Sequence, residues 1–281
     1  MEVRSNLTRR ELFSLSVTAA LPLILHRQRD WMAQFPQLAH YCKSLRKVPG
    51  GAYQLGNDTH ADSERPQHAV TLSPFRLGAT PVNVALWKEY CKATSMEMPA
   101  APAWGWLDDH PVVNISYSDI TTAVHASGKP GFLAWAVLTS GVELMLPTEA
   151  QWEAAAQSKR ASDDYPWGPT FDSSKLWCSK DTWKDSGKTA STLRKDRIHT
   201  NASGIRDLVG NVWEWCQDWN GPYSADSLVD PLGPSNGTRR AIRGGSWYNE
   251  WPDVFRTAYR YRMLPEKRED NIGFRLAAAM K

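Results

Sequence analysis

Residues able to carry redox or metal chemistry are few and scattered in this chain of 281 residues. The cysteines form no CxxC pair and lack metal-ligand spacing; they are Cys42, Cys91, Cys178 and Cys216. Four buried thiols are expected, with one disulfide as the alternative. The histidines form no HxxxH or HxxxHxE group, and neither HExxH, GxSxG nor a phosphate-binding glycine loop occurs. The sequence therefore offers no familiar catalytic motif.

Hard oxygen donors gather in the segment DLVGNVWEWCQDW, residues 207–219. Asn211 and Glu214, with nearby carbonyls, are ligands of the kind that Ca²⁺ requires, so they are candidate residues for a structural calcium site. The alternative is that these groups satisfy loop amides and the N–H groups of the neighbouring indoles.

A third set of reactive side chains lies in RTAYRYRM, residues 256–263. As a strand, this stretch would alternate, with Arg256, Ala258, Arg260 and Arg262 on one face and Thr257, Tyr259, Tyr261 and Met263 on the other. Tyr and Arg dominate interface energies when packed centrally, which favours a binding face. Alternatively, the tyrosines cover a core and the arginines pair with Glu266, Glu269 and Asp270.

Short elements with many turns must position these groups. Residues 48–56 and 68–78 alternate like two strands that pair, and Val212, Trp213 and Trp215 indicate another short strand. Residues 82–94 predict an amphipathic helix capped by Asn83, and 116–127 predict a weaker one. The strongest helix signal is at 146–160, where Thr148 and Gln151 form a capping box.

The overall charge gives no reason to expect nucleic acid or an anionic membrane as partner, since 33 basic residues nearly balance 30 acidic ones. Residues 1–47 form an amino-terminal segment in which Arg9 and Arg10 precede an apolar run at 12–25. This pattern resembles a twin-arginine export signal, and a short amphipathic helix in a cytoplasmic protein is the alternative. No other segment predicts a membrane span.

Ordered motifs from residue 48 onward resemble those of the formylglycine-generating-enzyme (sulfatase-modifying factor) family. They include LPTEAQWEAAA at 146–156, GNVWEWCQDW at 210–219, RAIRGGSW at 240–247 and NIGFRLA at 271–277. The resemblance implies one domain over 48–281 with an irregular, loop-rich α+β fold of the C-type-lectin-like kind, often holding Ca²⁺.

Catalytic members of that family bind copper through two cysteines located between the GGS turn and the GFR end, because thiolates select Cu(I). This chain has no cysteine between Gly244 and Arg275. We therefore expect no bound copper and no formylglycine chemistry. An oxidoreductase or sulfatase-maturation factor with an altered active site is the alternative.

The stretch also resembles a non-catalytic branch, the variable proteins of diversity-generating retroelements. In that branch a scaffold of RGGSW, spaced Arg and Ala, and IGFR carries variable residues that bind a protein or other macromolecule. The resemblance assigns the exposed ligand face here to Tyr248, Asn249, Glu250, Trp251, Asp253, Phe255, Thr257, Tyr259, Tyr261, Met263, Glu266, Lys267 and Glu269.

Overall fold

The computed structural model describes residues 31–157, 163–179 and 199–280. The predicted export signal lies outside the described residues. No helix within the described ranges is long and apolar enough to cross a bilayer.

The described strands form three sheets. The first has the order β1-β4-β11-β5 and joins the two ends of the described fold. In it, β11 lies antiparallel to both β4 and β5, pairing Ala277 with Leu77 and with Met145. The strands are β1 (Arg46–Val48), β4 (Phe75–Leu77), β5 (Leu144–Met145) and β11 (Ala277–Ala279).

The second sheet carries most of the motif residues, in the order β10-β6-β8-β9. Its strands are β6 (Trp213–Trp219), β8 (Arg240–Arg243), β9 (Arg260–Met263) and β10 (Ile272–Gly273). The short strand predicted around Trp213 is confirmed and extends to Trp219. Strand β9 is an edge of the sheet and pairs antiparallel with β8, so that Arg243 faces Arg260 in register.

The third sheet confirms the predicted pairing of the first two strands. Strand β2 (Gly51–Leu55) runs antiparallel to β3 (His68–Leu72), from Gly51 opposite Leu72 to Leu55 opposite His68. Strand β7 (Leu228–Val229) adds in parallel to β3. Between β2 and β3 stands a short 3-10 helix, η1 (Asp62–Glu64), whose Glu64 is fully buried.

Two of the predicted helices are α5 (Val84–Thr94) and α6 (Tyr117–Thr121). Helix α5 begins where the Asn83 side chain accepts the N–H of Leu86, as predicted. Helix α6 occupies only the start of the predicted helix at 116–127, because Thr122 turns to an extended conformation. The other helices are α3 (Trp31–Gln34), α4 (Pro36–Ser44), α7 (Phe132–Ser140) and α8 (Glu149–Ala156), with short 3-10 helices η2 (Ser173–Lys175) and η4 (Pro252–Phe255).

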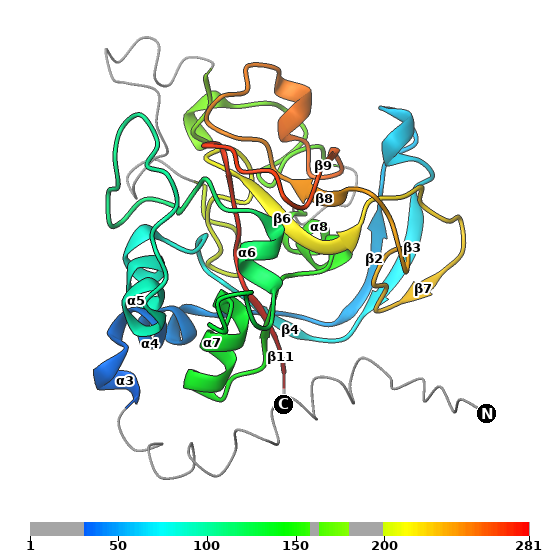
Figure 1. Cartoon of the computed structure of the whole chain (residues 1–281). Coiled ribbons are helices and arrows are strands. Elements are labelled where there is room, and N and C mark those ends of the chain that lie inside the picture. The colour runs from blue at the N-terminus through cyan, green and yellow to red at the C-terminus, as the bar shows by residue number, and fades with distance from the viewer. Residues whose placement is uncertain (1–30, 158–162, 180–198, 281) are drawn as a thin grey trace, which may run out of the picture.

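Figure 1 shows α4, α5 and α7 grouped on one side of the molecule and the β2-β3-β7 sheet on the opposite side, with β6, β8 and α8 between them. Buried side chains form one cluster around the helices and another around α8. Leu38 and Tyr41 of α4 belong to the first cluster. The core therefore includes side chains from the segment before residue 48.

Candidate ligand-binding face

Helix α8 places two carboxylates under the carboxy-terminal stretch. It starts at Glu149 because Thr148 Oγ1 accepts the N–H of Gln151, 3.1 Å away, and Gln151 Oε1 accepts the N–H of Thr148 at 3.0 Å. This confirms the predicted capping box. Glu149 and Glu153, four residues apart, then lie on the same side of the helix and both are buried.

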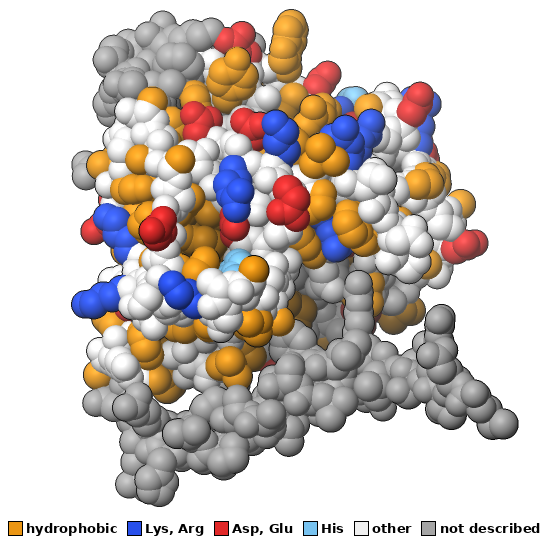
Figure 2. All heavy atoms as spheres, in the orientation of Figure 1, with side chains coloured by type: hydrophobic (Ala, Val, Ile, Leu, Met, Phe, Trp, Pro, Cys, Tyr) orange, Lys and Arg blue, Asp and Glu red, His pale blue; other side chains and the backbone are white. Residues whose placement is uncertain are grey.

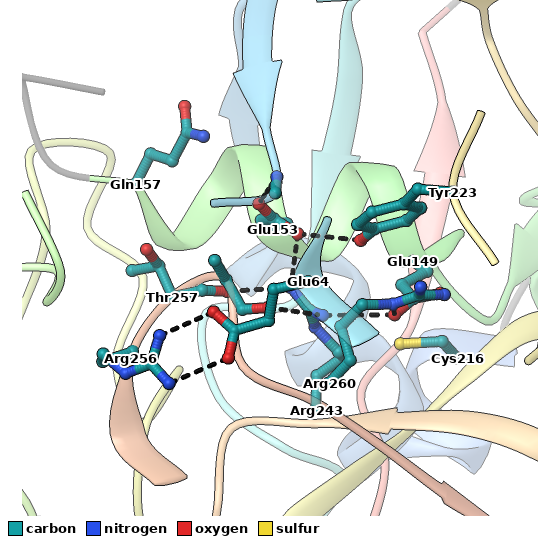
Figure 3. Close-up of polar contacts among 12 residues, drawn as sticks. Glu64, Glu149, Glu153, Gln157, Cys216, Tyr223, Arg243, Arg256, Thr257 and Arg260 are labelled. Atoms are coloured by element: carbon teal, nitrogen blue, oxygen red, sulfur yellow. Dashed lines mark hydrogen bonds and ion pairs between the residues drawn. The ribbon is translucent and has the colours of Figure 1, made fainter. Parts of the chain in front are cut away.

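These two carboxylates bind two buried arginines, as Figure 3 shows. Arg243 donates to Glu149 at 3.1 Å and to Glu153 at 2.5 Å. Arg260 donates to both oxygens of Glu149 at 2.7 Å. Burial opposes ionisation of Glu149, but the charges and hydrogen bonds of Arg260 and then Arg243 outweigh it and lower the pKa of that carboxyl. The cluster thus stays ionised inside the protein.

Two further arginines of the stretch make bidentate pairs with distant acids. Arg256 donates to Glu64 at 2.6 and 2.8 Å (Figure 3), and Arg275 donates to both oxygens of Glu214 at 2.6 Å. All four side chains are at most 4% exposed. The alternative partners proposed from sequence, Glu266, Glu269 and Asp270, are therefore not the partners of Arg256, Arg260 or Arg275.

Glu214, one of the two predicted calcium ligands, has internal partners. Both oxygens of Glu214 face the guanidinium of Arg275, and one of them also accepts the indole N–H of Trp152 at 2.8 Å. Asn211 is 1% exposed, with a positive φ of 61°. Within the described ranges no three His, Cys, Asp or Glu side chains are grouped to share a metal. The alternative interpretation, in which these groups satisfy internal partners, therefore describes Glu214. The calcium site at Asn211 and Glu214 stays a prediction.

The four cysteines are free thiols, as predicted, and three of them are buried. Burial, followed by the charges of Glu149 and Asp218, raises the pKa of Cys216 well above its ordinary value. In the structure this thiol is therefore protonated, which disfavours the thiolate that a nucleophile requires.

Part of the predicted ligand face is exposed. Trp251 is 74%, Tyr248 64% and Tyr261 47% exposed. The charged residues Glu250, Asp253, Glu266 and Lys267 are also exposed, whereas Asn249, Tyr259, Met263 and Glu269 are half-buried. Figure 2 shows hydrophobic side chains among acidic and basic ones over the region where Figure 1 places β8, β9 and the loop before β9.

Two residues assigned to that face are buried, and their assignment is corrected. Phe255 is 0% exposed and stacks against Phe171 with ring centroids 6.0 Å apart. Thr257 is 4% exposed, and its carbonyl accepts a hydrogen bond from Arg243 at 2.8 Å. Both belong to the scaffold because they close the space above the arginine cluster.

The continuous strand predicted over 256–263 is also wrong in its first half. The chain forms helix η4 and a turn, and β9 starts only at Arg260. Arg256, Thr257 and Ala258 are all buried, so the alternation is broken before the strand begins. Arg262, assigned to the face of the buried arginines, is exposed. Tyr261 still points outward, as predicted.

Buried indoles support the exposed rings from below. Trp213 packs against Tyr261 and Tyr259, with centroids 5.5 and 6.2 Å away. Trp247 contacts Tyr248 at 5.6 Å and donates its indole N–H to the carbonyl of Asp270 at 3.2 Å. Asn249 Oδ1 accepts two hydrogen bonds from Ser246, which fixes the turn between them. The exposed rings therefore stand on a rigid base.

This arrangement, an irregular, loop-rich α+β domain with a carboxy-terminal stretch held by buried Arg–Glu pairs, defines the C-type-lectin-like fold of formylglycine-generating enzymes. The chain belongs to the family described as the sulfatase-modifying factor enzyme 1-like domain, whose model matches residues 33–280.

Relatives of this chain include catalytic and differently named proteins. A formylglycine-generating enzyme of Streptomyces coelicolor is 28% identical over 82% of this chain and 88% of that enzyme. Among solved structures, Treponema denticola variable protein 1 matches with a TM-score of 0.66 at 25% identity, covering 84% of this chain and 95% of that one. PvdO from Pseudomonas aeruginosa matches with a TM-score of 0.68 at 23% identity, covering 84% and 94%.

The acidic partners of the buried arginines could not be identified from the sequence. Glu64 lies 192 residues before Arg256, and Glu153 lies 90 residues before Arg243. The only available signal for Glu153 was its position four residues after Glu149 on a well-capped helix. No local pattern marks Glu64.

Proposed function

We propose that this protein is a non-catalytic ligand-binding member of its family, which presents the exposed part of residues 248–269 to a protein or other macromolecular partner. One observation carries this proposal. Within a single stretch, Arg243, Arg256, Arg260 and Arg275 are buried in ion pairs, while Tyr248, Trp251 and Tyr261 are exposed between them. Buried ion pairs hold the backbone, and the exposed rings have no internal role that requires their identity.

The chemistry of the thiols supports a non-catalytic role. The stretch from Gly244 to Arg275 contains no cysteine, so it cannot supply the thiolate pair of the copper-binding members. Cys178 and Cys216 are each 0% exposed and lie elsewhere in the fold. Burial keeps the Cys216 thiol protonated.

Binding would work by preorganisation. A Tyr or Trp side chain loses little rotamer freedom on binding, and loops already fixed by ion pairs lose little more. The indoles of Trp213 and Trp247 restrict the neighbouring tyrosines before any partner arrives. Such central aromatic residues supply most of the binding energy at protein interfaces.

A crosslinking experiment tests the role of the face. A photoreactive amino acid is placed at Tyr248 in one protein and at Val229, an equally exposed residue on β7, in another. In extracts of the native host, we expect the label at position 248 to capture a defined partner that the label at 229 does not. Adding Trp251→Ala to the labelled protein should abolish this capture, whereas Val124→Ala should leave it intact. Capture that is insensitive to Trp251 would contradict the proposal.

The competing function is an oxidoreductase of altered mechanism, favoured by the 28% identity to the Streptomyces enzyme. The purified chain is incubated with Cu(I) and a cysteine-containing peptide under oxygen. We expect neither stoichiometric copper binding nor aldehyde formation. Oxidation of the peptide thiol by the wild-type chain would establish the enzyme instead.

Membership of the retroelement-diversified branch is a narrower proposal. It rests on the spacing of the exposed residues between the buried scaffold positions and on the structural likeness to the Treponema protein. A reverse-transcriptase gene beside a near-copy of the terminal coding segment is the expected finding. A genomic neighbourhood without either would restrict the conclusion to ligand binding.

A further inference from the structure

A cavity of about 320 Å³ lies between the start of α8, the end of β6 and the loop at 220–234. Its volume is in the range of small-ligand sites. The rim includes Ser224 and Leu232, which are both exposed, so the cavity is open to solvent. Its wall combines apolar and charged groups, among them Leu55, Leu228, Glu149, Asp218 and Arg260. The exposed residues of the 248–269 face do not line it.

Asp218 is the unusual member of this wall. Its side chain is 4% exposed, and its Oδ2 accepts the N–H of Glu149 at 2.8 Å. Glu64, Glu149, Glu153 and Glu214 each bind a buried arginine, but no described cationic side chain forms an ion pair with Asp218. Arg260, which also lines the cavity, has its Nε and Nη2 donors on Glu149. Among the described residues, Asp218 is therefore a buried carboxyl that forms no ion pair.

Asp218, together with the ion-pair cluster of Glu149, Glu153, Arg243 and Arg260 beside the cavity, gives one carboxylate more than guanidiniums. Glu149, Glu153 and Asp218 bring three carboxylates, whereas Arg243 and Arg260 bring two guanidiniums. Tyr223 does not change the count, because burial raises the pKa of its phenol and its hydroxyl donates to Glu153 at 3.1 Å. The His68 ring lies against Tyr223 with its Nδ1 at the carbonyl of Pro66.

The titration of Asp218 agrees with this count. Burial, followed by the negative charge of Glu149, raises the pKa of the Asp218 carboxyl to about 7. A bound cation would favour the ionised form and lower that pKa. The free protein instead neutralises the excess charge with a proton.

We propose that the cavity binds a small organic monocation, a primary alkylammonium group, whose counter-ion is Asp218 and whose alkyl part lies against Leu55, Leu228 and Leu232. The ammonium would balance the charge of the cluster, and the aliphatic wall would remove the alkyl chain from water. A divalent metal fits less well, because the described residues hold no group of three ligands that could share one.

Titration of the full chain with n-butylammonium chloride tests the site, followed by calorimetry and by NMR shifts of the Leu228 and Leu232 methyl groups. We expect saturable binding at one site, and at least tenfold weaker binding by Asp218→Asn, which keeps an oxygen for the N–H of Glu149. Asp226→Asn, which changes an exposed acid in the same loop, should bind like the wild type. Equal binding by Asp218→Asn, or equal binding of butan-1-ol by the wild type, would overturn the proposal. Butyrate should not bind.

A pH series on the wild type keeps the proposal testable if Asp218→Asn fails to fold. An alkylamine, like a Lys side chain with a pKa of about 10.4, stays protonated from pH 5.5 to 8. We expect the affinity to fall about tenfold for each pH unit below about 7, because Asp218 then holds a proton. An affinity that is constant across this range would contradict the assignment of Asp218.

Discussion

Two sets of side chains alternate along residues 243–275 and differ in almost every physical respect. Arg243, Arg256, Arg260 and Arg275 are at most 6% exposed, and each binds a carboxylate from another part of the chain. Tyr248, Trp251 and Tyr261 are between 47% and 74% exposed. The first set connects the stretch to α8, η1 and β6 through ion pairs. The second set makes no such connection beyond the indoles that pack under its rings.

This difference separates the residues that hold the fold from the proposed binding surface within one segment. A buried ion pair is costly to break, since a charge left without its partner in the interior is strongly unfavourable. An exposed side chain away from special features contributes little to stability. Mutations can therefore change the chemistry of the surface while the arginines keep the loop in place.

The largest expected effect comes from breaking a scaffold pair. Arg275→Met should lower the free energy of unfolding by about 3–5 kcal/mol, because Glu214 would remain buried without its counter-ion. Urea denaturation followed by Trp fluorescence measures the loss. Arg262→Met, at an exposed arginine of β9, is the matched control and should change stability by less than about 0.5 kcal/mol. Similar losses in the two variants would remove the distinction between scaffold and surface.

The second prediction compares paired with unpaired buried carboxyls. Burial raises the pKa of Asp218 from 3.8 to about 7, so between these values the folded state holds a proton that the unfolded state has released. Stability must therefore fall as pH rises through this window, by about 1.4 kcal/mol for each pH unit. The free energy of unfolding is measured at several pH values from 5 to 7. Its decrease per pH unit should be smaller by about that amount in Asp218→Asn and unchanged in Asp226→Asn. An identical slope in all three proteins would contradict the assigned pKa.

The local elements of this fold were predictable because their signals are local. These signals act within a few residues, so they can be read directly from the sequence. They are the capping box at Thr148, the cap at Asn83 and the alternation of β2 and β3. Helix α7 gave no such signal, since its sequence FLAWAVLTS is apolar on all sides and has no polar face to define a period.

The candidate site was predictable only in part. Its location and the outward orientation of Tyr248, Trp251 and Tyr261 could be inferred, but the burial of Phe255 and Thr257 could not. A regular alternation assumes a continuous strand, whereas the chain forms a 3-10 helix over Pro252–Phe255 and then a turn, and Arg256 pairs with Glu64 across 192 residues. Such long-range pairs leave no trace in a local pattern.

A smaller effect is expected where the scaffold depends on a helix cap. Thr148→Ala removes the acceptor for the N–H of Gln151 and should cost about 1 kcal/mol. Thr148→Ser keeps the hydroxyl and should recover most of the loss in the same denaturation assay. Because α8 still carries Glu149 and Glu153, the cost should stay below that of Arg275→Met. A loss equal to that of Arg275→Met would mean that the cap, and not the ion pairs, holds the stretch.

The smallest effect on stability, and the largest on binding, is expected at the exposed rings. Trp251→Ala and Tyr248→Ala should each change the free energy of unfolding by less than about 0.5 kcal/mol, because neither ring is buried. Each should weaken a partner captured through this face by about 2 kcal/mol or more, which is roughly thirtyfold in affinity. Phe255→Ala is the opposite case, since removing a fully buried ring should cost about 3–5 kcal/mol of stability. If Trp251→Ala unfolded the domain as Phe255→Ala does, the exposed rings would belong to the scaffold and the stretch would have no free surface to offer a ligand.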